Sequence, residues 1–336
     1  MGYKYIQSLY LEQQFFINTM SHLFLGKLIN RKGFEVSFCN FGATITSFKV
    51  PISDGDQIDI VLGFDHVDDY KKSFELESRP FLGAVVGPHA GRVKSGKYMD
   101  DEIEIQLEQN CGEHHLHGGS LNLSNQYWEV VVKSDNRLVF EIVLNNGKTK
   151  YTAEYFLNDD TLFANLRAET KVNTLINLTQ HSYFNLDGHQ GIVSDLKMKL
   201  EAEKFLEKDS ALLPTGKLVK TQSSDFDFSE FRRCPSQIDT SFVLTAKNPG
   251  AILKNEKNGL MLKVYTNQPI IHVYVGGHTH PIIGKENTVY HTTSGICFEA
   301  QNFPDSPNHA NFTNGILRAG EKYTNEIAYK LELGSI

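Results

Sequence analysis

The sequence predicts an all-β protein built from antiparallel strands. From Leu23 onward, short runs of alternating or apolar residues end in turn residues, and few stretches show the helical period of 3.6. The turns include Ser-Asp-Gly at 53–55, Lys-Ser-Gly-Lys at 94–97 and Asn-Asn-Gly at 145–147, and such residues favour tight reversals. Repeated short strands of this kind form sheets that pack face to face or close on themselves.

Six segments carry the strand pattern most clearly, because apolar, β-branched and aromatic residues dominate each of them. In chain order they are 34–38, 58–62, 102–105, 128–132, 138–143 and 151–156. A short helix without obvious chemistry is expected at 68–77.

The chain shows no proline-rich linker, low-complexity tract or internal repeat that would divide it. We therefore expect one large domain over residues 23–336, preceded by an N-terminal extension of unknown role at 1–22. The first nineteen residues lack the continuous apolar stretch and cleavage site of a secretory signal. No segment approaches the roughly 18 consecutive apolar residues of a membrane span, so none is expected.

The composition is that of a water-soluble globular protein. Of 336 residues, 40% are hydrophobic and 22% are charged, and 33 Lys and Arg against 40 Asp and Glu give a net charge of −7. Without long basic runs, nucleic-acid binding is not expected. No CxxC pair occurs, so neither a disulfide framework nor a cysteine zinc site is expected and a reducing, cytoplasmic location fits. The cysteines are Cys39, Cys111, Cys234 and Cys297.

Four segments depart from the strand-and-turn pattern, because each concentrates polar residues among glycines, aromatic residues or prolines. They cover residues 86–93, 114–119, 177–186 and 295–305. In the first, Arg92 offers a forked, permanently charged donor beside Gly91, although an arginine taken alone is most often a surface or structural residue. In the third, His181 follows an apolar run, where a lone histidine is usually a hydrogen-bonded core residue.

The second segment contains three histidines, His114, His115 and His117. Alternate residues of a strand face the same side, so His115 and His117 are expected to share one face. A zinc site needs a third ligand and outer hydrogen-bond partners, and no residue at short spacing supplies them. We therefore expect no metal site.

The fourth segment contains the least usual residue, Glu299, within the apolar run Ile-Cys-Phe-Glu-Ala. Burying a carboxylate costs several kcal/mol unless it is paired or functional. Glu299 therefore either ends a strand at the surface or lines a site.

In this order, the four segments resemble those of the aldose 1-epimerases (galactose mutarotases), and the resemblance runs from about Leu23 to Leu333. It implies a large antiparallel β-sandwich with an open sugar-binding cleft. It also implies interconversion of the α and β anomers of aldohexoses such as glucose and galactose, by acid–base ring opening without cofactor or metal. Further matching segments are 40–46, 59–65, 213–216, 238–244, 304–308 and 316–321.

By this resemblance, Glu299 is the general base and His181 the general acid at the ring oxygen. His117 is implied to lie near the ring oxygen and to assist binding or proton placement. Arg92 and Asp239 are implied to hydrogen-bond sugar hydroxyls. The expected partner is a small aldose, and the expected assembly is a monomer or a weak dimer.

The chain departs from the family pattern at four positions next to these residues. Pro88 and Gly91 replace a common arginine and asparagine, Gln180 replaces the asparagine before the catalytic histidine, and His114 stands where asparagine is common. The five implied chemical positions are all present, so activity is expected. The departures bear on substrate preference.

Three alternative functions remain open. A non-catalytic carbohydrate-binding sandwich has no reason to retain both Glu299 and His181. A glycoside hydrolase needs two carboxyl groups about 5–10 Å apart; Glu299 and Asp239 could supply them, but the histidines would then have no role. An epimerase of a phosphorylated or otherwise modified sugar would call for clustered cations, and only Arg92 stands near a site motif, which favours a neutral sugar.

Overall fold

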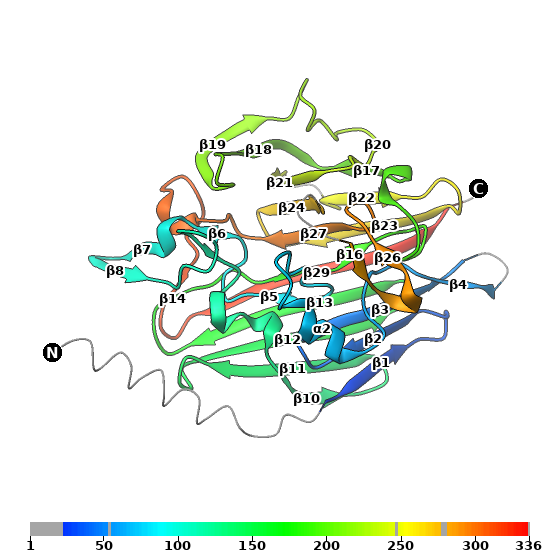
Figure 1. Ribbon diagram of the computed structural model, residues 1–336, viewed down its shortest axis with the longest axis horizontal. Coiled ribbons are helices and arrows are strands. Elements are labelled where there is room, and N and C mark those ends of the chain that lie inside the picture. Colours follow the sequence, from blue (N-terminus) through cyan, green and yellow to red (C-terminus); the bar gives the residue numbers. More distant parts are fainter. Residues whose placement is uncertain (1–22, 53–54, 246–247, 277–280, 335–336) are drawn as a thin grey trace.

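The computed structural model describes residues 23–52, 55–245, 248–276 and 281–334, and the strands of its sheets pair antiparallel (Figure 1). The predicted all-β class is confirmed. The extension expected at 1–22 lies outside the described residues. The largest sheet has nine strands, in the order β10 (Glu129–Lys133), β11 (Arg137–Leu144), β12 (Thr149–Asn158), β13 (Thr161–Thr170), β29 (Lys322–Leu333), β23 (Leu260–Thr266), β22 (Ala251–Lys254), β17 (Lys197–Leu200) and β20 (Arg232–Arg233).

Two smaller sheets accompany it. The six-stranded sheet has the order β16 (Tyr183–Phe184), β27 (Ile296–Gln301), β24 (Ile270–Val275), β21 (Ile238–Leu244), β18 (Ala202–Lys208) and β19 (Pro214–Lys220). The four-stranded sheet has the order β1 (Leu25–Ile29), β2 (Glu35–Cys39), β3 (Thr44–Pro51) and β4 (Gln57–Asp59).

Short two-stranded pairs and single turns of helix connect the sheets. The pairs are β5 (Val85–Val86) with β15 (Thr179–Gln180), β6 (Arg92–Val93) with β9 (His115–Leu116), β7 (Lys97–Asp100) with β8 (Ile103–Gln106), β14 (Thr174–Leu175) with β28 (Ile316–Leu317), and β25 (Ile282–Ile283) with β26 (Val289–Tyr290). The helices are α2 (Val67–Ser73) and the 3₁₀ turns η2 (Lys94–Gly96), η3 (Gly119–Leu121), η4 (Leu123–Asn125), η5 (Val193–Asp195), η6 (Lys285–Asn287) and η7 (Ser306–Asn308). In the described part of the chain, no helix is long and apolar enough to cross a bilayer.

The expected strands coincide with β2, β8, β10, β11 and β12 to within a few residues at their ends. The strand expected at 58–62 is shorter, because β4 ends at Asp59 and the chain then leaves the sheet. The helix expected at 68–77 occurs as α2 but ends at Ser73. Both differences concern where an element stops.

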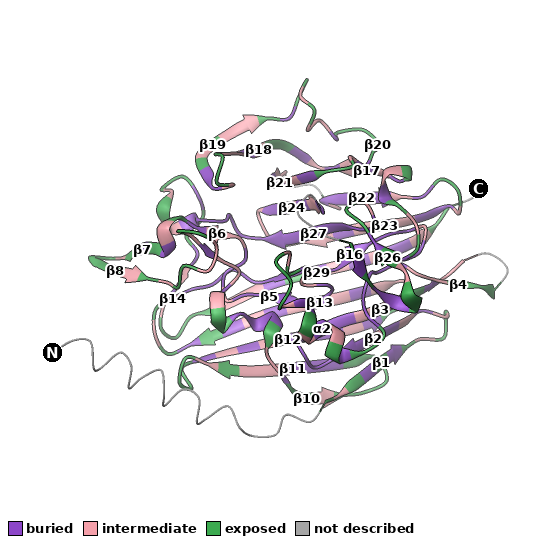
Figure 2. Cartoon of the chain, viewed as in Figure 1, coloured by how far each residue is buried: buried purple, intermediate pink, exposed green. Residues whose placement is uncertain are grey.

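A hydrophobic core joins the three sheets and follows the two-residue period of their strands. Tyr155 of β12, Phe38 of β2 and Phe298 of β27 are all fully buried members of one cluster. Buried residues gather in the central strands, whereas β10 and the β7–β8 hairpin carry many exposed ones (Figure 2).

The same period gives the central strands of the six-stranded sheet two different faces. Phe298 and Ala300 of β27, Val273 of β24 and Phe242 of β21 point into the core. The intervening residues therefore point to the opposite face. Glu299 is one of these, so its carboxyl group lies on the face turned away from the core.

A buried ion pair holds the 285–290 segment against β4. Nζ of Lys285 lies 2.7 Å from Oδ2 of Asp59, and both side chains are about nine-tenths buried. Lys285 also donates to the carbonyl of Val61, and Asp59 accepts from the hydroxyl of Ser47 and the amide of Phe48. Burial raises the pKa of Asp59, but the Lys285 ammonium outweighs it and the net pKa is lowered.

We expect Lys285→Met to lower the free energy of unfolding by about 3–5 kcal/mol, because it leaves the Asp59 carboxylate buried without its cation. Urea titration followed by circular dichroism measures the change. Lys97→Met is the matched control: Lys97 pairs with Glu104 in solvent, so its loss should cost no more than about 1 kcal/mol. Adding Asp59→Asn to Lys285→Met should recover part of the loss. Equal costs for the two lysines would contradict this account.

Candidate active site

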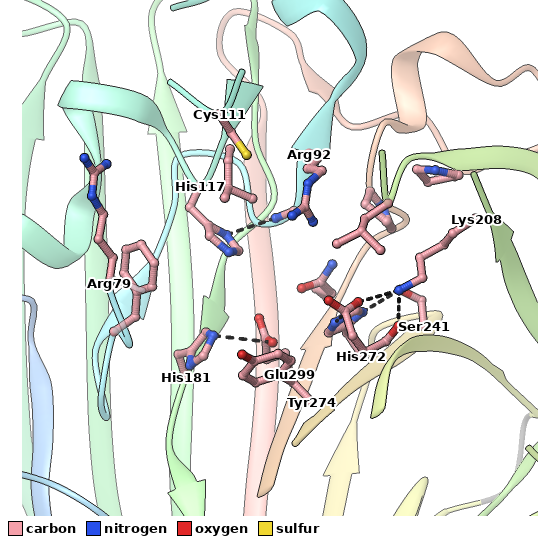
Figure 3. A pocket seen from close by; sticks show the side chains of 18 of the residues that line it. Arg79, Arg92, Cys111, His117, His181, Lys208, Ser241, His272, Tyr274 and Glu299 are labelled. Atoms are coloured by element: carbon pink, nitrogen blue, oxygen red, sulfur yellow. Dashed lines mark hydrogen bonds and ion pairs between the residues drawn. The ribbon is translucent and has the colours of Figure 1, made fainter. Parts of the chain in front are cut away.

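A cavity of about 540 Å³ lies on the polar face of the six-stranded sheet. It brings together residues that are far apart in the sequence and come from several loops and strands (Figure 3). All five predicted chemical residues line it, namely Arg92, His117, His181, Asp239 and Glu299.

Glu299 lies in the middle of β27 and does not end the strand, which continues to Gln301. Of the two readings from the sequence, the structure therefore supports a residue that lines a site. Its carboxyl group is nearly fully buried, and Oε1 lies 3.5 Å from Nε2 of His181. Burial, helped by the nearby charge of Asp239, raises the pKa of Glu299 to about 8.

His181 lies between β15 and β16, where its backbone is held at both ends. Its amide donates to the carbonyl of Ala84, and its carbonyl accepts from the amide of Gly83. The ring lies beside those of Phe81 and Tyr183. Burial lowers the pKa of His181 to about 4, since the charged imidazolium is disfavoured where water is excluded.

His181 and Glu299 therefore form a pair that holds one proton at neutral pH. Burial favours a protonated carboxyl on Glu299 and a neutral imidazole on His181. Transfer of that proton across the 3.5 Å gap gives a carboxylate and an imidazolium with the same total charge. In either state one group can donate a proton while the other accepts one.

Only one residue of the histidine cluster, His117, lines the cavity. Strand β9 ends at Leu116, and His117 has a left-handed backbone with φ of 53°. The strand alternation expected for His115 and His117 therefore does not extend to His117, and that prediction is wrong. His115 instead donates through Nδ1 to the carbonyl of Glu108, and His114 accepts from the amide of Ser95.

A backbone contact sets the tautomer of His117. Its Nδ1 accepts a hydrogen bond of 3.2 Å from the amide of Gly91, so a neutral ring carries its proton on Nε2. Burial and the neighbouring charges of His181 and Arg92 hold the pKa of His117 well below its usual range. A neutral ring of this tautomer offers one fixed N–H donor.

Asp239 belongs to a connected polar group on β21, β24 and β18. Its Oδ1 lies 2.6 Å from Nζ of Lys208 and 3.5 Å from Nε2 of His272. Nδ1 of His272 lies 2.8 Å from the hydroxyl of Ser241. Burial raises the pKa of Asp239, but His272 and Lys208 outweigh it and bring the pKa down to about 2. Asp239 is therefore ionised in the same cavity in which Glu299 retains its proton.

Two loop contacts place Arg92 at the cavity. Arg92 pairs with Leu116 across β6 and β9, and Oδ1 of the fully buried Asp305 accepts from the amide of Lys94. Gly91, just before Arg92, has φ of 85°, and a Cβ there would lie 2.7 Å from Cβ of Pro304. A side chain at position 91 would thus be strained and crowded.

Asn177 joins the three segments that carry Arg92, His181 and Glu299. Its side-chain amide donates to the carbonyls of Ala90 and Asn302 at 3.1 and 3.0 Å and accepts from the amide of Asn302 at 2.8 Å. Its own amide donates to the carbonyl of Pro88, and its carbonyl accepts from Ala90. Asn177 is completely buried.

Of the four departures from the family pattern, only Gly91 lines the cavity. Gln180 is buried and donates to the carbonyl of Gly83, and it accepts from the amide of Ser182. Pro88 and His114 also lie outside the cavity lining. Three of the four departures therefore act on the framework behind the site.

The sequence interpretation missed several residues of the cavity. His272 and Tyr274 alternate with core residues of β24, the same signal that singled out Glu299, and this pattern could have revealed them. Lys208 and Arg79 carry no such signal, because one ends a strand and the other lies in a loop.

Comparison with known proteins shows the family to which the sequence is similar. The sequence matches the aldose 1-epimerase family over residues 26–330. It is 33% identical over 321 residues to galactose mutarotase of Bos taurus, and the aligned region covers 89% of this chain and 91% of the bovine protein. It is 30% identical over 328 residues to aldose 1-epimerase of Escherichia coli K12, and the aligned region covers 90% of this chain and 93% of the bacterial protein.

Solved structures show the same fold. A GalM/aldose epimerase homologue from C. elegans superposes with a TM-score of 0.87 at 28% identity, covering 94% of this chain and all of that one. Galactose 1-epimerase from Lactobacillus acidophilus superposes with a TM-score of 0.80 at 28% identity, covering 93% of this chain and 95% of that one.

We expect Asn177→Ala to lower the free energy of unfolding by about 2–4 kcal/mol, because it leaves buried carbonyl and amide groups without partners. Urea unfolding measures the loss. Asn158→Ala provides the control: Asn158 is exposed at the end of β12, so its replacement should stay within about 0.5 kcal/mol. If Asn177→Ala were as mild as the control, Asn177 would not hold the three segments together.

Proposed function

The chain belongs to the aldose 1-epimerase family, and we propose that it interconverts the α and β anomers of aldohexoses, with Glu299 as general base and His181 as general acid. Aldose 1-epimerases are isomerases, and the relatives named above include a galactose mutarotase and a galactose 1-epimerase. These names support galactose as a substrate, and the family resemblance adds glucose. The observation that carries the proposal is the 3.5 Å approach of Nε2 of His181 to Oε1 of Glu299, buried in one cavity.

Ring opening needs two proton transfers on neighbouring oxygens. The reaction starts from the state in which the shared proton is on His181 and Glu299 is a carboxylate. Glu299 takes the proton of the anomeric hydroxyl, a carbonyl forms at C1, and the bond from C1 to the ring oxygen breaks. His181 gives its proton to the ring oxygen. Both oxygens are bonded to C1 in the closed ring, so two groups as close as these side chains can each face one of them.

Ring closure reverses these transfers after rotation about the C1–C2 bond. The rotation presents the other face of the carbonyl, so the hydroxyl that attacks it gives the opposite anomer. The attacking hydroxyl returns its proton to His181, and the carbonyl oxygen takes its proton back from Glu299. The pair ends with the single proton it started with, and no other reactant is consumed.

The remaining predicted residues fit substrate binding. The Nε2–H of neutral His117 suits a contact near the ring oxygen, beside His181, since the two rings lie 6.2 Å apart between centroids. Arg92 donates and the ionised Asp239 accepts, so together they suit sugar hydroxyls. A site built to pair hydroxyls discriminates strongly against ligands that lack them.

A phosphorylated sugar is the second candidate substrate, because Arg79 and Lys208 line the cavity in addition to Arg92. Lys208 is already paired with Asp239, and Arg79 lies exposed at the rim. A neutral sugar therefore remains the preferred substrate. A glycoside hydrolase is less well supported, since a histidine rather than a second carboxyl group faces Glu299.

A cytoplasmic location and a monomeric or weakly dimeric state complete the proposal. The four cysteines are free thiols, which suits a reducing compartment.

Glu299→Gln and His181→Asn should each lower the catalysed rate of mutarotation by about 10²–10⁴-fold, because each removes one proton-transferring group. Polarimetry of freshly dissolved α-D-galactose, α-D-glucose and α-D-glucose 6-phosphate measures the rate and ranks the sugars. Glu75→Gln, in an exposed turn, is the control and should keep the full rate. Full activity of either site variant would remove that residue from its role.

The catalysed rate should follow a bell-shaped pH profile with limbs near pH 4 and pH 8. Below the pKa of His181, about 4, the pair gains a second proton and no base remains. Above the pKa of Glu299, about 8, the pair loses its only proton and no acid remains. Polarimetry corrected for the reaction in buffer alone tests this; a rate still rising with pH above about 9 would contradict the one-proton pair.

A further inference from the structure

We propose that His272 is a positioning residue which, with Lys208, occupies Oδ1 of Asp239, so that Oδ2 is the fixed acceptor for one sugar hydroxyl. This inference rests on the proposed function in one respect, that Asp239 binds the sugar. It assigns roles to His272, Lys208 and Ser241, which were not among the predicted site residues.

The strand register brings these groups together. His272 of β24 lies directly opposite Glu299 of β27 on one side and opposite Ser241 of β21 on the other. The three side chains therefore form one row across the floor of the cavity, on the face turned away from the core (Figure 3). Asp239 lies two residues before Ser241 on the same face of β21.

The donors and acceptors of each group decide which way the hydrogen bonds along this row point. A neutral imidazole carries one proton, and burial lowers the pKa of His272 to about 4, so it is neutral at neutral pH. Nε2 faces a carboxylate oxygen 3.5 Å away, which can only accept, and the proton is therefore favoured on Nε2. Nδ1 is then the acceptor for the hydroxyl of Ser241 at 2.8 Å.

Lys208 completes the arrangement from the next strand. Its ammonium lies 2.6 Å from Oδ1 of Asp239 and also donates to the backbone carbonyl of Asp239. Oδ1 thus has two neighbouring donors, whereas Oδ2 has no hydrogen-bond partner among the described residues. A carboxylate held on one oxygen presents the other in a fixed direction, and bonds to an ionised acceptor are stronger than neutral ones.

This arrangement predicts that His272 affects binding through one hydroxyl of the sugar. Loss of its N–H lets the carboxylate of Asp239 turn about its side-chain bonds, so the bond to that hydroxyl weakens. A sugar that lacks this hydroxyl never makes the bond, so its Kd should not change when the N–H of His272 is lost. A merely structural role of His272 would weaken the binding of every sugar alike.

Isothermal titration calorimetry of D-galactose and its 2-, 3-, 4- and 6-deoxy derivatives tests the proposal. We expect His272→Leu to raise the Kd for galactose about tenfold, the loss of much of one charge-assisted hydrogen bond. For one deoxy sugar the wild type and His272→Leu should have the same Kd. His272→Gln keeps an N–H donor and should restore most of the affinity.

Two further variants keep the test decisive. Ser241→Ala removes only the partner of Nδ1 of His272. It should cause a smaller loss of affinity that depends on the same single hydroxyl. This variant tests the proposal even if His272→Leu fails to fold. His66→Leu is the control, because His66 is exposed before α2 and makes no side-chain cap bond. An equal loss for all five sugars, or no loss, would overturn the proposal.

The readout is binding and not turnover. If Glu299 and His181 proved not to carry the proton transfers, the pattern of Kd values would stand unchanged. Conversely, normal catalysis with an equal loss for all sugars would overturn the role of His272 alone.

Discussion

The pocket depends on the buried side chain of Asn177, where three segments of the chain meet. Ala90, two residues before Arg92, and Asn302, three residues after Glu299, are both bonded to its amide, and His181 follows four residues later. Asn325 of β29 joins segments in the same way, because its side-chain amide donates to the carbonyls of Leu178 and Ala300. Buried amides of this kind are stable only when their partners are in place, so they fix how the segments that carry Arg92, His181 and Glu299 lie relative to one another.

Environment then decides the charge of the two carboxyl groups on the cavity floor. Glu299 has a neutral imidazole beside it and retains its proton, whereas Asp239 has Lys208 and stays ionised. One sheet face thus holds one protonated and one ionised carboxyl group, although the two residues have the same functional group. The difference arises from the cationic and imidazole groups around Asp239, namely His272 and Lys208.

Much of the fold and part of the site could be predicted from the sequence. Alternation or apolar runs revealed β2, β8, β10, β11 and β12, and in the half-buried strands among them one side must carry the apolar residues. Glu299 stood out since a carboxylate in an apolar strand needs a reason. His181 and Asp239 became site candidates only through family resemblance. The role of Asn177 could not be predicted, because nothing in the sequence distinguishes it from other asparagines. Its role follows from contacts between three segments that are distant in the sequence. The end of β4 at Asp59 was missed for the same reason, since Lys285, its partner, lies more than two hundred residues away.

The same strands carry the residues of the cavity floor on one face and core residues on the other, and this constrains how such a protein can evolve. In β24 and β27 residues that pack in the interior alternate with His272, Tyr274 and Glu299, which line the cavity. A change at Val273 or Phe298 that repacks the interior also shifts the neighbouring cavity residues of the same strand, so selection acts on both at once there. The rim, built from the loops around Arg79 and Leu212, is free of this coupling. New sugar preferences can therefore arise at the rim by drift while the chemistry beneath stays conserved.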